Sequence, residues 1–319
     1  MMQLKGGMGV TDRARLGVFH RSLPLLAAAE NRLFARQNIE VEYAGVASST
    51  EQFANLAAGS YQLVHTAPDN VLNYRLNHGN ALGARLPLVV IAGMDYGLGL
   101  QLVTRAALTF EDLPGRKLSV DAPDSGYAYV AYALLARHGL RRDRDYEVVS
   151  HGGAAGRLER LLANQADATM LSGALAIRAH QAGLGVIADV REVAHPYLGG
   201  VIATTEPWLN AHRELVVRFL RAFVTATRWA LDARHAGQAQ AMLARAHRMG
   251  DGAAGALYAL EVQPGVGAVS DGAIPNEALR NVLVLRQRSG GFEESHDLDA
   301  LIDGPLVDRS VLADALAAM

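Results

Sequence analysis

The chain alternates short apolar segments with longer segments of helical pattern, and this alternation constrains the fold more than any other feature. Residues 15–19 have the composition of a short buried strand. Residues 22–37 follow as a helix, with a hydroxyl residue and a proline at its start, as helix N-termini favour. Residues 39–43 alternate apolar and polar side chains, which indicates a half-buried strand. Such alternation of strands and helices is typical of βαβ units on a mostly parallel sheet.

The same succession of segments occurs twice. The helix end and strand at 33–43 resemble those at 134–148, and the segment 56–63 resembles 162–169. In both stretches helix, strand, helix and strand follow in the same order at similar spacing. We therefore expect two similar α/β lobes instead of one continuous sheet. After the second stretch the pattern changes to helices, including an amphipathic helix over 214–232.

The composition excludes several classes of function. The formal net charge is -2 and the basic residues are scattered, so no nucleic-acid partner is expected. The chain has no cysteine, which excludes disulfides, thiolate metal sites and cysteine nucleophiles. The apolar run at 86–92 is only strand-length, so no transmembrane segment is expected.

The sequence contains no motif for a cofactor, a metal or a nucleophile. His65 and Asp69 lie close in sequence, but Pro68 intervenes, and no helix carries paired metal-binding histidines. The glycine-rich loop at 152–156 lacks the Lys-Ser/Thr pair of a phosphate-binding loop and the spacing of a dinucleotide fingerprint. No Gly-x-Ser-x-Gly elbow occurs. We expect no cofactor, no metal and no catalytic residue.

The N-terminal residues 1–10 are rich in glycine and lack the apolar region of a secretory signal. Two interpretations follow and both stay open. Either a leader is missing from this sequence, or the protein stays inside the cell.

Five segments, in order along the chain, together resemble one known family. They are a Pro-led helix, a Leu-Ala-x-Gly element before a strand, the entry to the second lobe, a tryptophan before a long helix and a late Pro-Leu-Val-Asp. They lie at 23–34, 56–59, 113–120, Trp208 and 305–308. With this order and spacing the chain resembles the nitrate/sulfonate/taurine and thiamin-precursor group of type II periplasmic substrate-binding proteins of ABC transporters.

The resemblance extends over most of the chain, and it departs from the family at Asn38, where a glycine is usual. It implies two α/β lobes joined by two crossover segments, with the ligand cleft between them. The crossings are expected near 102–104 and 202–205. Lobe one then comprises 1–103 plus 204–319, and lobe two comprises 104–203. Hinge closure around the ligand is the motion that the family implies.

The resemblance also implies a function without chemistry. The protein is expected to bind a small-molecule ligand as the solute-binding component of an ABC importer, as a monomer, and to deliver the ligand to permease and ATPase subunits. It implies a periplasmic location. The alternative, motivated by the absent leader, is a cytosolic enzyme or ligand sensor of the same fold that acts on a small heterocycle or organic acid. The desulfinase and thiamin-pyrimidine synthase branches of the fold depend on cysteine, which this chain lacks.

Candidate ligand-binding residues follow from one rule of α/β folds. Ligands bind outside the carboxyl ends of the strands, where loops and helix N-termini meet. Residues that follow the expected strands are therefore expected to face the cleft. The main candidates are His20, Arg21, Ser22, Pro68, Asp69, Asn70, Asp95, Tyr96, Asp121, Ser125, Gly126, Tyr127, Ser172 and Tyr197. The same rule brings in Phe19, Thr66, Ala67, His151, Gly173, Leu198 and Gly199.

These candidates differ in the ligand groups that they would suit. Ser125 opens a helix whose free N–H groups could receive an oxyanion, although plain N-capping explains such a serine equally well. Arg21 could pair with an anion through its guanidinium fork. Asp95 and Asp121 suit an amine or a ring N–H donor instead. Tyr127 could stack on a planar ring or simply pack in the core. This mixture favours a neutral or zwitterionic ligand over a strongly anionic one.

Overall fold

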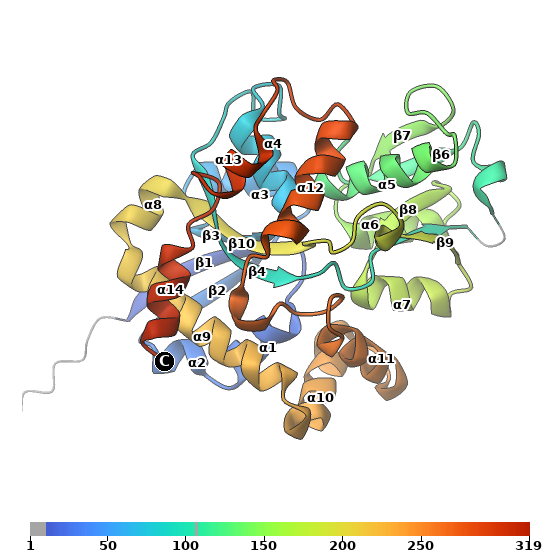
Figure 1. Cartoon of the computed structure of the whole chain (residues 1–319). Coiled ribbons are helices and arrows are strands. Elements are labelled where there is room, and N and C mark those ends of the chain that lie inside the picture. The colour runs from blue at the N-terminus through green and yellow to red at the C-terminus, as the bar shows by residue number, and fades with distance from the viewer. Residues whose placement is uncertain (1–10, 106–107) are drawn as a thin grey trace, which may run out of the picture.

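The computed structural model describes residues 11–105 and 108–319. The segment 1–10, on which the question of a leader rests, lies outside the described residues. Figure 1 shows two groups of strands, each with helices on its faces. The strands form two five-stranded sheets of mixed direction. The expected α/β fold of the type II periplasmic-binding class is therefore confirmed.

The first sheet has the strand order β2-β1-β3-β10-β4. Strand β1 pairs in parallel with β2 and β3, whereas β10 runs antiparallel to both of its neighbours. The bounds are β1 Asp12–Val18, β2 Ile39–Gly45, β3 Leu63–Thr66, β4 Leu88–Asp95 and β10 Gly200–Thr205.

The second sheet has the order β7-β6-β8-β5-β9. Strand β6 pairs in parallel with β7 and β8, whereas β5 runs antiparallel to both of its neighbours. Position by position, this repeats the pattern of the first sheet, as the duplicated sequence pattern predicted. The bounds are β5 Gln101–Thr104, β6 Lys117–Val120, β7 Glu147–Ser150, β8 Ala168–Leu171 and β9 Gly185–Asp189.

Both connections between the sheets come earlier in the chain than the sequence predicted. Strand β5 already belongs to the second sheet and β10 to the first, so the chain passes between the sheets at 96–100 and 190–199. The crossings expected near 102–104 and 202–205 are wrong in position. The physical reason is that each antiparallel strand makes its backbone hydrogen bonds in the sheet that it enters, not in the one that it leaves. The division of the whole chain into two lobes stays a prediction.

Helices cover the faces of both sheets (Figure 1). The helix expected over 22–37 is broken into α1 and α2, because Arg32 has a left-handed backbone with φ 54°. The α-helices are α1 Leu23–Glu30, α2 Leu33–Arg36, α3 Ser49–Ala57, α4 Pro68–Leu76, α5 Gly126–Arg137, α6 Ala154–Leu162, α7 Gly173–Gln181, α8 Glu206–Ala211, α9 Arg213–Leu231, α10 Ala236–His247, α11 Asp251–Val262, α12 Asn276–Arg288, α13 Leu298–Ile302 and α14 Ser310–Ala317. Short 3-10 helices occur at η1 Phe110–Asp112, η2 Val190–Glu192, η3 Ala233–His235 and η4 Ser270–Gly272.

The helices that follow β10 contact both halves of the molecule. Helix α9 packs on α1, and its buried stripe includes Phe219 and Phe223, as the amphipathic pattern predicted. Helix α12 contacts both α4 and α5, and α11 contacts α7 (Figure 1). One core cluster contains Val90 of the first sheet together with Leu118 of the second. The two sheets therefore share buried apolar contacts. Within the described part of the chain, no helix has the length and hydropathy of a membrane-spanning segment.

Candidate functional site

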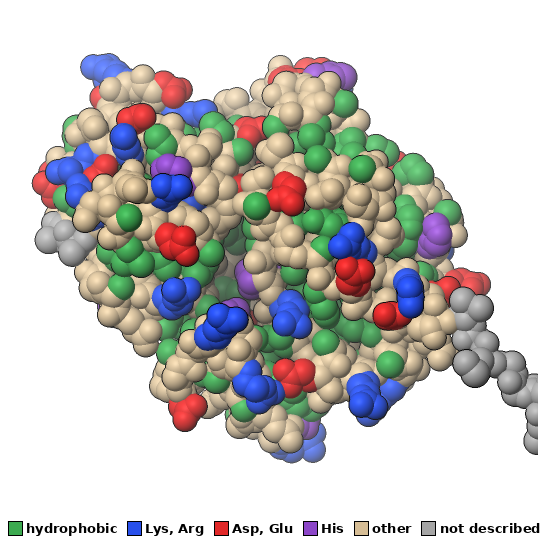
Figure 2. Space-filling view, turned by 180° about the vertical axis from the view of Figure 1, so that it is seen from behind, with side chains coloured by type: hydrophobic (Ala, Val, Ile, Leu, Met, Phe, Trp, Pro, Cys, Tyr) green, Lys and Arg blue, Asp and Glu red, His purple; other side chains and the backbone are tan. Residues whose placement is uncertain are grey.

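A cavity of about 530 Å³ lies between the two sheets. The first sheet contributes residues at the ends of β1, β2, β3 and β4, and the second contributes residues after β6, β7 and β8. Figure 2 shows a hollow near the middle of one face of the molecule, with histidine side chains at it. The cavity therefore has the position that the strand-end rule predicts for a ligand site.

The structure brings eight of the main candidates together in the cavity wall. They are His20, Asn70, Asp95, Asp121, Ser125, Gly126, Tyr127 and Ser172. Of the wider set, Phe19, Thr66, Ala67, His151, Gly173 and Gly199 also line the cavity, whereas Leu198 does not. Their role in ligand binding stays a prediction.

Four further candidates lie near the cavity without lining it. Arg21 is exposed, and its guanidinium carbon lies 5.4 Å from the centre of the Tyr43 ring. Ser22 is buried at the start of α1, where its hydroxyl makes no capping bond. Tyr96 is half-buried, and Tyr197 is buried in the core between the sheets. The first three follow a strand or open a helix, and Tyr197 precedes β10, but none of the four lines the cavity.

The remaining candidates, Pro68 and Asp69, open α4 and are buried behind the cavity wall. Asp69 Oδ2 lies 2.6 Å from Nη1 of Arg286, and both side chains are almost completely buried. The Asp69 carboxylate is therefore paired with the guanidinium of Arg286, which explains why it is not part of the cavity wall.

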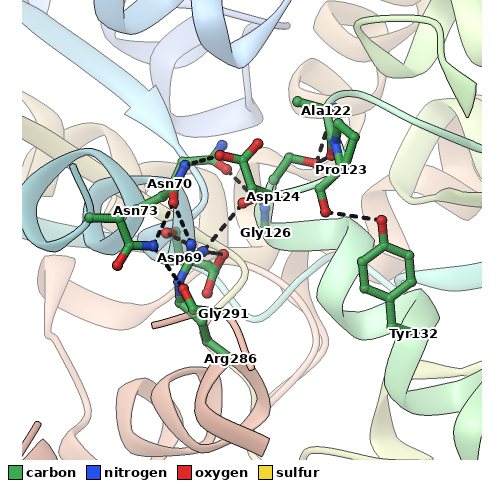
Figure 3. Close-up of polar contacts among 12 residues, drawn as sticks. Asp69, Asn70, Asn73, Ala122, Pro123, Asp124, Gly126, Tyr132, Arg286 and Gly291 are labelled. Carbon is green, nitrogen blue, oxygen red and sulfur yellow. Dashed lines mark hydrogen bonds and ion pairs between the residues drawn. The ribbon is translucent and has the colours of Figure 1, made fainter. Parts of the chain in front are cut away.

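The pair of Asp69 and Arg286 is the centre of a polar network that connects three parts of the fold (Figure 3). Arg286 on α12 also donates to the side-chain oxygen of Asn73 on α4 and, at 3.3 Å, to the backbone oxygen of Asp124, which precedes α5. Its guanidinium carbon lies 4.7 Å from the centre of the Tyr129 ring of α5. Burial raises the pKa of the Asp69 carboxyl to about 6, and Arg286 opposes this rise. The network ties helices of the two sheets together beside the cavity.

The first-sheet wall of the cavity carries two buried carboxyl groups. Asp95 ends β4, and its Oδ2 lies 3.7 Å from Nε2 of His65 on β3. Glu261 on α11 accepts a hydrogen bond from the backbone N–H of Leu23 at 3.4 Å. Burial and the neighbouring Asp95 raise the pKa of Glu261 to about 8.

Two further histidines face the same wall. The ring centres of His20 and His65 are 5.6 Å apart, and those of His20 and His247 are 6.5 Å apart. Loss of hydration lowers the pKa of His20 below 6.5, and the neighbouring His65 lowers it further. The His20 side chain is exposed, and the part of its surface that the protein leaves open faces the cavity. Loss of hydration also lowers the pKa of His247. Both rings are therefore neutral at pH 7.

The second-sheet wall is built from the N-terminal ends of α5, α6 and α7. Helix N-termini carry unpaired N–H groups and favour negative charge. Arg157 in the first turns of α6 is 3% exposed, donates from Nη2 to the backbone oxygen of Met170 at 3.3 Å, and has no partner for its Nε within the described residues. Burial lowers the pKa of Arg157, and Asp121 opposes this effect. This wall therefore combines helix N-termini with one buried cation.

Ser125 does not cap α5. Its hydroxyl donates to the backbone oxygen of Ala122 at 2.8 Å, and the N-cap position has no side-chain cap bond. The N–H of Gly126 donates instead to Oδ1 of Asn70 at 2.9 Å, which is a bond between the two halves of the molecule. The capping interpretation of Ser125 is thus wrong, and the first N–H of α5 is already used.

Two more hydrogen bonds cross between the walls. Asp121 Oδ2 accepts from the backbone N–H of Ser49 at 3.0 Å, and the N–H of Gly153 donates to the backbone oxygen of Ala47 at 2.7 Å. The segment that follows β2 is therefore in direct contact with the loops that follow β6 and β7, and the cavity is closed at this edge.

Several residues of the wall were not predicted by the strand-end rule, chief among them Arg157, His247, Leu257 and Glu261. Three of them belong to α10 and α11, far along the chain from the strands that they face. Arg157 follows the loop after β7 by one helical turn, so its distance from the strand end hid it. No group of three or more His, Cys, Asp or Glu side chains in the described ranges could hold a metal ion.

Solved structures show how widespread this fold is. The alkanesulfonate-binding protein SsuA from Xanthomonas axonopodis pv. citri, bound to MOPS, is 16% identical with a TM-score of 0.75, over 93% of this chain and 98% of that chain. The periplasmic nitrate-binding protein NrtA from Synechocystis PCC 6803 is 16% identical with a TM-score of 0.79, over 98% and 89%. At such identities these likenesses establish the fold only.

Sequence comparison establishes the family. Curated protein sequences give no match. A family model described as an ABC transporter, phosphonate, periplasmic substrate-binding protein matches residues 19–223, which include every candidate named from the sequence. The expected resemblance to substrate-binding proteins of ABC transporters is thereby confirmed, although the matching model is the phosphonate one. The chain belongs to the family of periplasmic substrate-binding proteins of phosphonate-type ABC transporters.

Proposed function

We propose that this protein binds a small organic molecule in the cavity between its two sheets, acts in the periplasm as a monomer, and delivers the molecule to the permease and ATPase of an ABC importer. Binding occurs by hinge closure between two lobes, one built on the first sheet and the other on the second. The hinge segments are the connections at 96–100 and 190–199. The ligand is released unchanged.

One observation carries the proposal, namely that the cavity has charged and polar walls from both sheets. Arg157 with its unpartnered Nε stands on the second-sheet wall, and the carboxyl groups of Asp95 and Glu261 stand on the first-sheet wall. Buried charged groups are costly unless they are paired. A ligand that contacts both walls pairs them and holds the walls together, which is how ligand binding stabilises a closed state.

The oxyanion end of the ligand belongs on the second-sheet wall. Arg157 supplies a fork of N–H donors that fits carboxylate, sulfonate or phosphonate oxygens, and the start of α6 adds backbone donors. Arg157→Met is expected to weaken the binding of every anionic ligand by about tenfold or more, since bonds to charged groups contribute about 1.5–3 kcal/mol. Arg13→Met, at a side chain that is 81% exposed, is the matched control.

A thermal-shift screen of carboxylates, sulfonates, phosphonates, amino acids and pyrimidines tests the proposal. A ligand that binds only the folded protein at about 100 times its Kd adds about 2.7 kcal/mol of stability and raises Tm. The hit must be recovered chemically unchanged, and small-angle scattering must show a smaller radius of gyration with ligand. Conversion of the hit to a product would refute a pure binding role in favour of an enzyme.

A further inference from the structure

The charges of the cavity wall do not balance. The described lining residues include three carboxyl groups, on Asp95, Asp121 and Glu261, but one guanidinium, on Arg157. Asp121 stands on the same wall as Arg157 and stabilises its charge. The negative charge of Asp121 and the positive charge of Arg157 therefore offset one another. The pair of Asp95 and Glu261 on the opposite wall is left without a permanent cation, and burial together with the neighbouring Asp95 therefore favours the protonated form of Glu261.

Asp95 and Glu261 are largely removed from water, since Asp95 is 5% exposed and Glu261 is 4% exposed, although both line the cavity. Asp95 Oδ1 accepts from the N–H of Gly97 at 2.8 Å, and its Oδ2 lies 3.7 Å from Nε2 of His65. Glu261 accepts one long bond from a backbone N–H. Carboxylates in such surroundings are usually paired with a cation.

The neighbouring imidazoles add acceptors more than charge. The lowered pKa values of His20 and His247 favour their neutral forms. A neutral imidazole offers one ring nitrogen as a hydrogen-bond acceptor. The wall thus presents the Asp95 carboxylate, the Glu261 carboxyl and one acceptor nitrogen on each neutral imidazole. A protonated amine carries three N–H donors and one positive charge, and it complements such a wall.

We propose that Asp95, Glu261 and His20 form a subsite for a protonated amino group of the ligand. The inference rests on the proposed function, and it narrows the ligand class to zwitterions whose oxyanion faces Arg157 and whose ammonium group faces Asp95. The cavity of about 530 Å³ holds a small molecule with both groups. The subsite selects against the same molecule without its amino group.

Calorimetric titration of the intact chain with matched pairs of probes tests this subsite. The pairs are β-alanine with propionate, taurine with ethanesulfonate and 2-aminoethylphosphonate with ethylphosphonate. Within the pair whose oxyanion fits, we expect the amino member to bind at least about tenfold more tightly, as expected for a charge-assisted bond.

The variants Asp95→Asn and Glu261→Gln test the residues themselves. Each is expected to weaken binding of the amino member by about ten- to a hundredfold while leaving its amino-free partner unchanged or tighter. Both substitutions preserve shape, and the Tm of each free variant checks that it folds. Glu40→Gln, at a side chain that is 59% exposed, is the control and changes neither affinity.

The outcomes separate the two proposals. If the amino-free members bind as tightly as the amino members, or if both variants weaken the two members of a pair equally, the subsite is refuted while the binding function stands. If no member of any pair binds to the wild-type chain, while the broad thermal-shift screen finds another class of ligand, the ammonium subsite alone is refuted. If neither experiment finds a ligand, the proposed function fails and the subsite fails with it.

Discussion

Replacement of Arg286 by methionine tests whether the buried ion pair with Asp69 holds the fold together. The Arg286 side chain is fully buried, and Asp69 is 2% exposed. The substitution removes the bond to Asp69 Oδ2 at 2.6 Å and the bond to the backbone oxygen of Gly291 at 2.9 Å. Breaking a buried pair by removing one partner costs about 3–5 kcal/mol, because the other charge is left uncompensated. We expect Arg286→Met to lose that amount at pH 8.

The loss should depend on pH in a direction that follows from the Asp69 carboxyl. Its pKa in the folded protein is raised to about 6 from a value of 3.8, even with Arg286 beside it. Without Arg286 that pKa rises further. A carboxyl with a raised pKa in the folded state loses stability as pH rises from the unfolded pKa through the folded pKa. The variant is therefore closest to wild type near pH 5, and the gap widens towards pH 8.

Urea unfolding at pH 5 and pH 8 measures both effects, since the midpoint and slope give the free energy of unfolding. Arg280→Met on the same helix is the matched control, because Arg280 pairs with Asp299 at the surface and such pairs contribute about 0–1 kcal/mol. The double variant Asp69→Asn/Arg286→Met removes the stranded charge and should recover most of the loss. If Arg286→Met costs no more than Arg280→Met, or costs the same at both pH values, the reasoning is wrong.

Three further predictions concern the cavity. Glu261→Gln should be more stable than wild type above pH 8 by about 2–4 kcal/mol, measured by urea unfolding. The pKa of the wild-type carboxyl is raised to about 8 in the folded protein, so the wild-type protein loses stability as pH rises from about 4.5. Equal stability of the two proteins at all pH values would contradict this. Gly200→Ala should lower ligand affinity and reduce the free energy of unfolding by about 1–3 kcal/mol, since its Cβ would lie 2.3 Å from Asp95 Oδ2 and 2.9 Å from His65 Nε2. A variant with wild-type affinity would show that the surrounding side chains move away without cost. Arg157→Met should abolish the Tm rise caused by anionic ligands, measured relative to the Tm of the same variant without ligand, and a retained rise would place the oxyanion elsewhere.

The two-sheet architecture could be predicted because it depends on patterns within short segments. The order helix, strand, helix, strand occurs twice in the sequence, and the structure repeats the same strand order and directions in both sheets. The strand-end rule placed Asp95, Asp121 and Tyr127 at the cavity for the same reason, since position after a strand fixes which edge of the sheet a residue occupies. Local position predicts the edge of the sheet, but not the direction of a side chain.

The rest of the site depends on partners that are distant in sequence. Asp69 follows a strand as predicted, yet Arg286, 217 residues later, occupies its carboxylate. Glu261 stands on α11, in the part of the chain where the sequence predicted helices but no site residue, and it faces the cavity because α11 packs beside α7 and the start of α1. Which helix a strand end faces is decided by the packing of the whole chain. No pattern within a single segment records it.

The proposed ammonium subsite and the proposed hinge share the same backbone. Asp95 ends β4, the strand from which the chain leaves the first sheet, and Gly200 begins β10, the strand on which it returns. These two residues are paired in the sheet, and the N–H of Gly199 donates to the backbone oxygen of Asp95 at 2.9 Å. The Asp95 carboxylate therefore lies at the junction of both connections, and a ligand bound to it would act where the lobes must rotate. For this reason Asp95→Asn should reduce ligand-induced compaction measured by small-angle scattering, even at ligand concentrations that saturate the variant. Full compaction of the saturated variant would show that Asp95 contributes to affinity alone.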